Sequence, residues 1–317
     1  MIRAGRLVAI PTETVYGLAA NALDQAACAS IFAVKRRPAD NPLIVHVEDA
    51  LQASSLGELG ELGRQLASTF WPGPLTLVVK GRRGNATVAL RAPAHPVARQ
   101  LIALSGRPLA APSANLSGRP SPTTAEHVAA ELGSLVPLIL DGGACAIGLE
   151  STVVDLSGPT PLILRPGAIS EEMLASYGVL PATEGAAHAP SPGTRYQHYQ
   201  PAVPVVVIED GTGRTAAEVI DEWADALDRA GEVPALIAVG QARERRWQQR
   251  CFGSNAELAT GLFAAMRELE ADATVLLVSA PSAEGIGQAI RDRLRRAAGG
   301  AFHRAGEVPN WDLPKGD

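Results

Sequence analysis

Residues 7–18, Leu-Val-Ala-Ile-Pro-Thr-Glu-Thr-Val-Tyr-Gly-Leu, decide how the N-terminal part of the chain folds. Leu7–Ile10 is an apolar run that predicts a buried strand, and Pro11 ends it because proline cannot donate a hydrogen bond to a sheet. Four polar side chains follow within five positions: Thr12, Glu13, Thr14 and Tyr16. Polar groups directly after a strand lie at the edge of a sheet, where ligand sites of α/β folds often lie. A polar turn with a buried tyrosine accounts equally well for this stretch on its own.

The composition indicates a globular protein of two domains. The chain has 317 residues, 46% of them hydrophobic, and no run approaches the roughly 20 apolar residues that span a bilayer. No basic-then-apolar segment precedes the first strand, so we expect a cytoplasmic protein without a membrane segment. Cys28, Cys145 and Cys251 are widely spaced, which fits a reducing compartment and argues against a cysteine metal site.

The net charge is −5, and basic residues of the N-terminal part gather at 35–37, 82–83 and 91. Such local clusters suit an anion site better than a whole nucleic-acid-binding face. Four basic residues fall at the ends of expected elements: Lys35, Arg37, Arg91 and Arg165. They either line one pocket or make unrelated surface salt bridges.

The first 182 residues predict a mixed α/β domain. Besides the first strand, apolar runs predict strands at 43–47, 75–80, 87–91, 138–140, 151–156 and 162–164. Apolar residues at helical spacing predict helices at 25–34, 51–70, 96–105 and 125–132. The Ser/Gly/Pro-rich loop 112–122 supplies hydroxyls and free amides that could hold a phosphate.

Residues 183–203 predict a linker, whose end carries two tyrosines, a histidine and an arginine and is therefore expected to pack on the site. Beyond it, strands are predicted at 203–208, 235–239 and 274–279, and helices at 215–230, 256–271 and 286–298. This alternation predicts a small Rossmann-like parallel sheet. No Gly-x-Gly-x-x-Gly follows its first strand, so we do not expect dinucleotide binding. The basic run 243–250 reads as a solvated loop, with RNA contact as the alternative.

The candidate pocket combines cations, hydroxyls and His46, without a recognisable nucleophile paired to a base. Such a site holds anions and small polar groups in place, which is what phosphoryl-type transfer needs from a protein. The residues alone therefore indicate a nucleotide and a small polar substrate. The sequence has no Gly-x-x-x-x-Gly-Lys-Ser/Thr, so ATP would bind in another geometry.

Six motifs, in this order, closely resemble the YrdC-type domain of threonylcarbamoyl-AMP synthases. They lie at residues 7–18, 35–46, 71–79, 112–124, 148–155 and 164–168, and include Lys-Arg-Arg-Pro-Ala-Asp-Asn-Pro, Trp-Pro-Gly-Pro and Pro-Ser-Ala-Asn. Ser-Pro-Gly-Thr-Arg-Tyr-Gln-His-Tyr at 191–199 resembles the linker of the long, two-domain members, although Thr194 replaces a bulkier residue. The family's N-terminal helix is expected to be short or missing here.

The resemblance implies an α/β fold with a YrdC-like mixed twisted sheet over 1–182, a linker over 183–203 that closes over the active site, and a Rossmann-like domain over 204–317. It also implies a nucleotidyltransferase that condenses L-threonine, bicarbonate and ATP, with Mg²⁺, to threonylcarbamoyl-AMP and pyrophosphate. A downstream threonylcarbamoyl transferase complex would then modify the adenosine next to the anticodon of tRNA.

Site residues follow from the resemblance motif by motif. Contacts to L-threonine are implied for Thr14, His46, Arg91, Ala111 and Ser151. Contacts to ATP are implied for Lys35, Arg37, Asn41, Thr87, Ser113, Ser121, Arg165 and Tyr199, with Lys35 and Arg37 as the catalytic candidates. No residue is assigned as a metal ligand, because magnesium is often held mainly by substrate phosphates.

Three alternatives from other classes stay open. An RNA-binding module would show steep salt dependence, but only 4% of the residues are aromatic and few can stack on bases. A carbamoyl-transfer domain of the hydrogenase-maturation type belongs to longer chains with zinc-finger and acylphosphatase segments, which this sequence lacks. An amino-acid sensor would bind threonine without releasing pyrophosphate.

Overall fold

The computed structural model describes all residues except 83–86, 183–197, 241, 243, 301 and 307–317. The chain divides into two compact units, the first from Met1–Ser117 and Ser121–Tyr196 and the second from Gly118–Pro120 and Gln197–Asp317, apart from those residues. The predicted domain limit at 182 borders the undescribed segment 183–197, and the limit at 203 lies six residues beyond it; both stay predictions.

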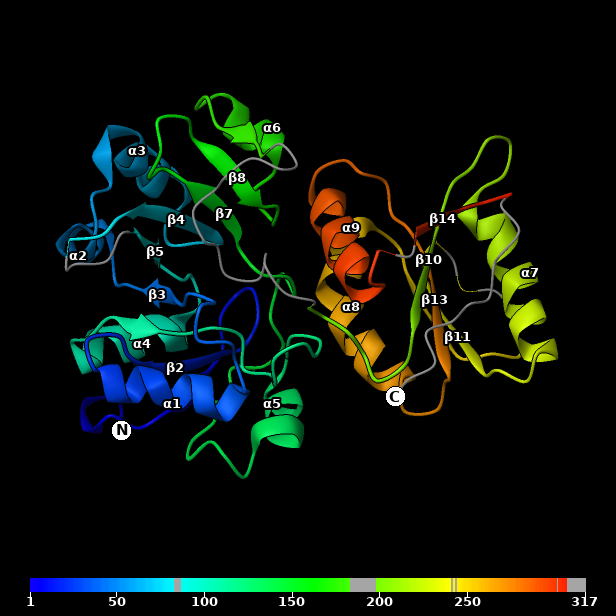
Figure 1. Cartoon of the computed structure of the whole chain (residues 1–317), viewed down its shortest axis with the longest axis horizontal. Helices are drawn as coiled ribbons and strands as arrows, with labels where there is room; N and C mark the ends of the chain where they lie inside the picture. The colour runs from blue at the N-terminus through cyan, green and yellow to red at the C-terminus, as the bar shows by residue number, and fades with distance from the viewer. Residues whose placement is uncertain (83–86, 183–197, 241, 243, 301, 307–317) are drawn as a thin grey trace. The chain divides into compact units, whose positions relative to one another are not determined.

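The first unit is built on a mixed sheet, which has nine strands among the described residues, in the order β1-β2-β6-β3-β5-β4-β7-β8-β9 (Figure 1). These strands are β1 (Val8–Ile10), β2 (Gly17–Asn21), β3 (Ile44–His46), β4 (Leu75–Lys80), β5 (Thr87–Arg91), β6 (Leu109–Ala110), β7 (Thr152–Asp155), β8 (Leu162–Arg165) and β9 (Leu180–Pro181). β3 runs parallel to β5, and β4 runs parallel to β7, whereas β4 and β5 are antiparallel. The predicted mixed α/β architecture is confirmed.

Helices of the first unit lie against this sheet. They are α1 (Gln25–Lys35), α2 (Ala50–Leu56), α3 (Gly60–Phe70), α4 (Pro96–Ser105), α5 (Ala125–Leu132) and α6 (Glu171–Ala175), preceded by the 3-10 turn η1 (Ile2–Ala4). Asp24 caps α1 by accepting hydrogen bonds from the first-turn amides, which otherwise have no partner.

The two faces of β4 pack differently. On one face, Leu75, Leu77 and Val79 belong to a large core with Leu66 of α3. On the other face, Val78 belongs to a small cluster of buried side chains with Ile44, Ala89, Val153 and the half-buried Leu164. The helices α2 and α3 therefore cover one face of the central strands, and the other face carries this smaller cluster.

The structure corrects the single helix predicted over 51–70. It is two helices, because the chain at Gly57 leaves the helix and forms an antiparallel bridge with Gly81. A Cβ on Gly57 would lie 2.6 Å from the Val79 side chain, so the bridge requires glycine here. The strand predicted at 138–140 is also wrong, since only Ile139 forms an isolated bridge, to Ala9.

The second unit has a five-stranded parallel sheet among its described residues, in the order β12-β11-β13-β10-β14. Its elements are β10 (Val205–Glu209), α7 (Ala216–Arg229), β11 (Pro234–Val239), β12 (Gln249–Phe252), α8 (Asn255–Leu269), β13 (Val275–Ser279), α9 (Ile286–Ala297) and β14 (Phe302–Arg304). Figure 1 shows α7 on one side of this sheet and α8 and α9 on the other. The Rossmann-like prediction is confirmed, although the edge strands β12 and β14 were not expected.

Arginines of the basic run in this unit take part in ion pairs. Arg245 pairs with Asp221, and Arg250 pairs with Glu268. Their charges are therefore compensated inside the unit, which weakens the RNA-contact interpretation of this run. No helix in the described part of the chain is long and apolar enough to cross a membrane.

Three residues of the loop 112–122 group with the second unit rather than the first. The Gln200 amide donates to the Gly118 carbonyl at 2.7 Å, and Arg119 forms an ion pair with Glu270. The sequence placed this loop wholly in the N-terminal domain, because a contact between segments about 80 to 150 residues apart leaves no local pattern.

Candidate active site

Polar side chains cross the first sheet in one row. His46 of β3 is the register partner of Arg91 of β5, and the β4–β5 register places Thr76 opposite Arg91. Thr76 is paired with Val153, which is paired with Arg165 of β8. We call His46, Arg91, Thr76 and Arg165 the polar row; each is at most 3% exposed. Partners in register share one face of a sheet, so these side chains belong to the same face.

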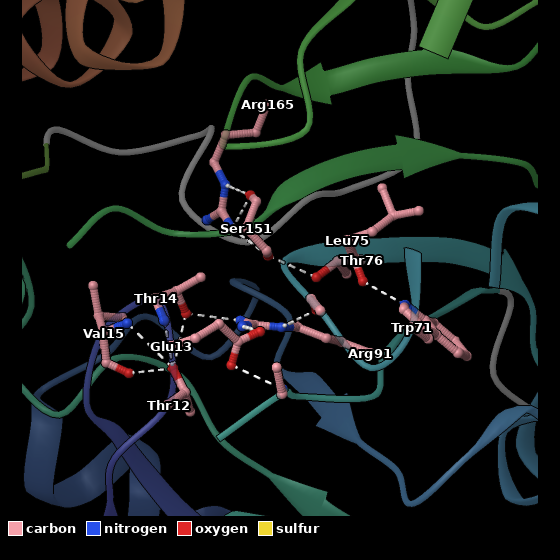
Figure 2. Close-up of polar contacts among 12 residues, drawn as sticks. Thr12, Glu13, Thr14, Val15, Trp71, Leu75, Thr76, Arg91, Ser151 and Arg165 are labelled. Atoms are coloured by element: carbon pink, nitrogen blue, oxygen red, sulfur yellow. Dashed lines mark hydrogen bonds and ion pairs between the residues drawn. The ribbon is translucent and has the colours of Figure 1, made fainter. Parts of the chain in front are cut away.

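Arg91 is held at three points of its guanidinium, as Figure 2 shows. Its Nε donates to the Gly73 carbonyl at 3.1 Å, its Nη1 to Thr14 Oγ1 at 2.9 Å and its Nη2 to Glu13 Oε1 at 2.6 Å. A guanidinium has five N–H groups, so two remain without an acceptor among the described residues. Two N–H groups on one planar cation are suited to a carboxylate.

Glu13 uses both carboxylate oxygens inside the protein. Oε1 accepts from Arg91, and Oε2 accepts from the Ala94 amide at 2.9 Å. Burial raises the pKa of Glu13, but the charge and hydrogen bond of Arg91, together with hydrogen bonds from the Glu13 and Ala94 amides, outweigh burial and lower that pKa from its usual value. The carboxylate is therefore ionised at neutral pH and balances the buried guanidinium.

His46 is buried, and its Nδ1 has no hydrogen-bond partner among the described residues. Burial and the nearby Arg91 charge lower the pKa of His46 to about 3. The imidazole is therefore neutral at physiological pH. A buried polar atom without a partner is costly, and a ligand could supply the missing hydrogen bond.

Ser151, which directly precedes β7, contacts two members of the polar row, Thr76 and Arg165. Its Oγ lies 2.7 Å from Thr76 Oγ1, and Arg165 Nη2 donates to its carbonyl at 2.9 Å and to its Oγ at 3.2 Å. The structure thus places Arg165, predicted as an ATP contact, with Ser151, predicted as a threonine contact. Figure 2 shows this pair together with Thr14 and Arg91.

A second polar group lies at the other end of the same strands. The pairing of Ile44 with Ala89 places Thr87 level with residue 42, next to Asn41. The Ala111 amide donates to the Ile44 carbonyl, which brings Ser113 to the same level. Asn41, Thr87 and Ser113 therefore lie near the start of β3 and β5, and His46 and Arg91 lie at the end of these strands.

Asn41 accepts two hydrogen bonds from Arg37, which follows α1. Arg37 Nη2 donates to Asn41 Oδ1 at 2.6 Å, and its Nε donates to the Asn41 carbonyl at 3.1 Å. Asn41 is 1% exposed, and its Nδ2 has no hydrogen-bond partner among the described residues. This amide is a donor that lacks an acceptor, as expected of a group that binds an anionic or carbonyl ligand.

Lys35, predicted as catalytic, supports the loop 112–122. Its Nζ donates to the Ser113 carbonyl at 2.5 Å and to the Asn115 carbonyl. Burial, followed by the charge of Arg37, lowers the pKa of Lys35 well below 10.5. The Lys35 amino group is thus engaged by backbone oxygens of the loop.

The remaining predicted residues are dispersed. Ser121 Oγ donates to Glu150 Oε1 at 2.5 Å, and both residues are buried beside Ser151. Ala111 uses its amide within the sheet, which leaves its carbonyl for a ligand. Tyr199 belongs to the second unit, where its ring stacks on Phe263 with centroids 5.3 Å apart. Its contact with a nucleotide stays a prediction.

The described residues contain no group of three or more His, Cys, Asp or Glu that could hold a metal ion. Magnesium keeps several waters and often binds through substrate phosphates with one or two carboxylates. Magnesium that arrives with the nucleotide stays a prediction.

Comparisons with known proteins identify the family. A family model described as "Telomere recombination" matches residues 1–167, and a model of the threonylcarbamoyl-AMP synthase C-terminal domain matches residues 169–299. The threonylcarbamoyl-AMP synthase of Pyrococcus abyssi is 42% identical over 94% of this chain and 92% of its own length. The chain belongs to the threonylcarbamoyl-AMP synthase family.

Other relatives agree with this assignment. The threonylcarbamoyl-AMP synthase of Bacillus subtilis is 40% identical over 96% of this chain and 92% of its own length. The crystal structure of P. abyssi Sua5 complexed with L-threonine has a TM-score of 0.90 at 40% identity, and covers 96% of this chain and 94% of the solved one. The two-domain form of the synthase predicted from the motifs is therefore confirmed.

Sequence reasoning missed two residues of the synthase site. Thr76 stands alone in the apolar run Leu75–Val79, and one hydroxyl inside a buried strand was the signal available. Glu13 stood in the opening motif but was assigned no role, since its partner Arg91 is 78 residues away. A carboxylate between two threonines after a strand was the only local sign.

Proposed function

We propose that this chain synthesises threonylcarbamoyl-AMP from L-threonine, bicarbonate and ATP, releasing pyrophosphate. The observation that carries the proposal is the buried guanidinium of Arg91, which keeps two N–H donors for a carboxylate. The P. abyssi relative crystallised with L-threonine supports it, since its chain matches this one almost throughout.

Threonine would bind at the polar row. Its carboxylate would accept from Arg91, and neutral His46 and the Ser151 hydroxyl would bind its other polar groups. Because His46 carries no charge at neutral pH, it can form a hydrogen bond without competing with Arg91 for the carboxylate. Ala111 would add a backbone carbonyl.

ATP would lie next to threonine, so that its α-phosphorus is within reach of the carbamate oxygen. Asn41 Nδ2 would donate to a phosphate oxygen, while Arg37 holds the Asn41 side chain and adds positive charge. Ser113, Ser121 and Thr87 would supply hydroxyls, and Lys35 would fix the loop that carries Ser113. Magnesium, when it arrives with ATP, would neutralise phosphate charge.

The reaction would proceed in two steps. The threonine amine adds to bicarbonate, which gives a carbamate and releases water. A carbamate oxygen then attacks the α-phosphorus of ATP, and the bond to pyrophosphate breaks. The protein's part is to align the carbamate with ATP and to stabilise the developing negative charge. A buried site also limits hydrolysis of the carbamate and of the mixed anhydride.

Pyrophosphate release by the purified full chain tests this function. With ATP and magnesium present, release should require L-threonine and bicarbonate together. Release without either would indicate an ordinary ATP-cleaving enzyme, and threonine binding without release would indicate a sensor. Mass spectrometry of the product should show threonylcarbamoyl-AMP.

The wider context of the reaction is also a proposal. We infer that the product passes to a transferase that modifies tRNA, because a mixed anhydride is an activated donor that water would otherwise consume. We also propose that the protein works in the cytoplasm, where ATP and tRNA are found; fractionation of cells that express the tagged chain would test this.

A further inference from the structure

We propose that Glu13 is the positioning residue of the threonine site: it orients Arg91 so that the two remaining N–H groups of the guanidinium form the carboxylate fork. This inference rests on the proposed function. It concerns a residue that would not itself touch threonine.

The contacts of Glu13 point to positioning rather than direct binding. Each of its oxygens already accepts a hydrogen bond, one from Arg91 Nη2 at 2.6 Å and one from the Ala94 amide at 2.9 Å. The side chain is only 11% exposed. Glu13 therefore links the Arg91 guanidinium to a backbone amide three residues after Arg91. This link fixes the guanidinium relative to the end of β5.

The segment that carries Glu13 is itself held in place. Thr12 Oγ1 accepts from the Thr14 and Val15 amides at 3.2 Å and donates to the Val15 carbonyl at 2.6 Å. Thr14, the next residue, also binds Arg91. Two neighbouring side chains on this hydrogen-bonded turn thus bind two different nitrogens of one guanidinium. These two contacts fix the rotation of the guanidinium about its Cδ–Nε bond.

Charge provides a second reason for Glu13. It is the only ion-pair partner of Arg91 among the described residues, and both are buried. A buried guanidinium without a counter-charge is unfavourable. Without Glu13, the Arg91 side chain would therefore move toward solvent when no threonine is bound. Glu13 keeps the cation in place before threonine arrives.

Glu13→Gln removes the charge and one of the two acceptor oxygens and keeps the size of the side chain. In glutamine an NH2 donor replaces one of the two oxygens, so the group that faces it, Arg91 or the Ala94 amide, loses its acceptor. If orientation dominates, the KM for L-threonine should rise at least tenfold, while the KM for ATP stays within twofold. If the charge of Glu13 only repelled the ligand carboxylate, the substitution would leave the KM for threonine unchanged or lower it. That result would overturn the proposal.

A ligand without a carboxylate supplies the specific readout. Calorimetric binding of L-threonine should weaken at least tenfold in Glu13→Gln, whereas binding of L-threoninamide should change less than twofold. Equal weakening of both ligands would show a general structural role and refute the inference. Glu126→Gln, which removes an exposed carboxylate of α5, is the matched control and should behave as wild type.

A double variant keeps the test valid if Glu13→Gln folds poorly. Arg91→Gln with Glu13→Gln leaves no unpaired buried charge, so it should be more stable than Arg91→Gln alone. In the Arg91→Gln background, Glu13→Gln should cause no further loss of threonine affinity. An additional tenfold loss there would mean that Glu13 acts independently of Arg91. Wild-type protein that fails to bind threonine would refute the proposed function instead.

Discussion

Lowering the pH from 8 to 5 should destabilise the first unit through His46. The folded pKa is about 3, against 6.5 for an unperturbed histidine, because the imidazole is buried beside Arg91. Above pH 6.5 both states are neutral and His46 has no effect on stability. Below it the unfolded chain takes up a proton that the folded chain does not, so stability falls as pH falls from 6.5 toward 3.

The magnitude follows from these two values. At pH 5 the unfolded imidazole is about 97% protonated and the folded one about 1%, which removes about 2 kcal/mol of stability relative to pH 8. The full difference, reached below pH 3, is about 5 kcal/mol. This is a large part of the stability of a typical domain.

Urea unfolding of the full chain and of His46→Gln at pH 8 and pH 5 measures the effect. Amide exchange of peptides from β3, β5 and β6 assigns the transition to the first unit. Wild type should lose about 2 kcal/mol more than His46→Gln between the two pH values. His303→Gln, in β14 of the second unit, controls for the removal of one imidazole. A wild-type and a His46→Gln protein with the same pH dependence would refute the burial argument.

Three further predictions follow from single contacts. Arg91→Lys should raise the KM for L-threonine about tenfold or more without changing that for ATP, because an ammonium cannot form the two-donor fork; equal KM values would contradict it. Asn41→Ala should raise the KM for ATP about fivefold, the equivalent of one lost hydrogen bond of about 1 kcal/mol, and an unchanged value would remove Asn41 from the site. Leu66→Ala should lower the free energy of unfolding of the first unit by about 2–5 kcal/mol, while Leu51→Ala, 81% exposed, should not; urea unfolding compares the two.

Local patterns predicted much of the fold. The alternation of apolar strands with amphipathic helices after residue 203 is enough to indicate a parallel sheet, because strand and helix periodicities repeat within a few residues. The edge strand β12 was not predicted, because its residues Gln249 and Arg250 are polar. Its strand conformation depends on pairing with β11 rather than on its composition.

The helix break at Gly57 shows where local reasoning fails. Residues 51–70 have helical composition throughout, yet a bridge to Gly81 interrupts the helix. The partner strand lies more than 20 residues away, so no window over the helix contains the cause. β2 was missed for a related reason, because Ala19 and Ala20 have low strand propensity but are buried between β1 and β6.

By itself, the sequence determined the family, the two α/β halves and most candidate contacts, since motifs and periodicity are written in neighbouring residues. The tertiary structure alone decided that His46, Arg91, Thr76 and Arg165 share one row, and that Glu13 holds Arg91. It also decided that His46 is neutral and that the Lys35 amino group binds a backbone carbonyl of the loop 112–122. Strand register and burial create these features, and both depend on how distant segments pack, which no local pattern records.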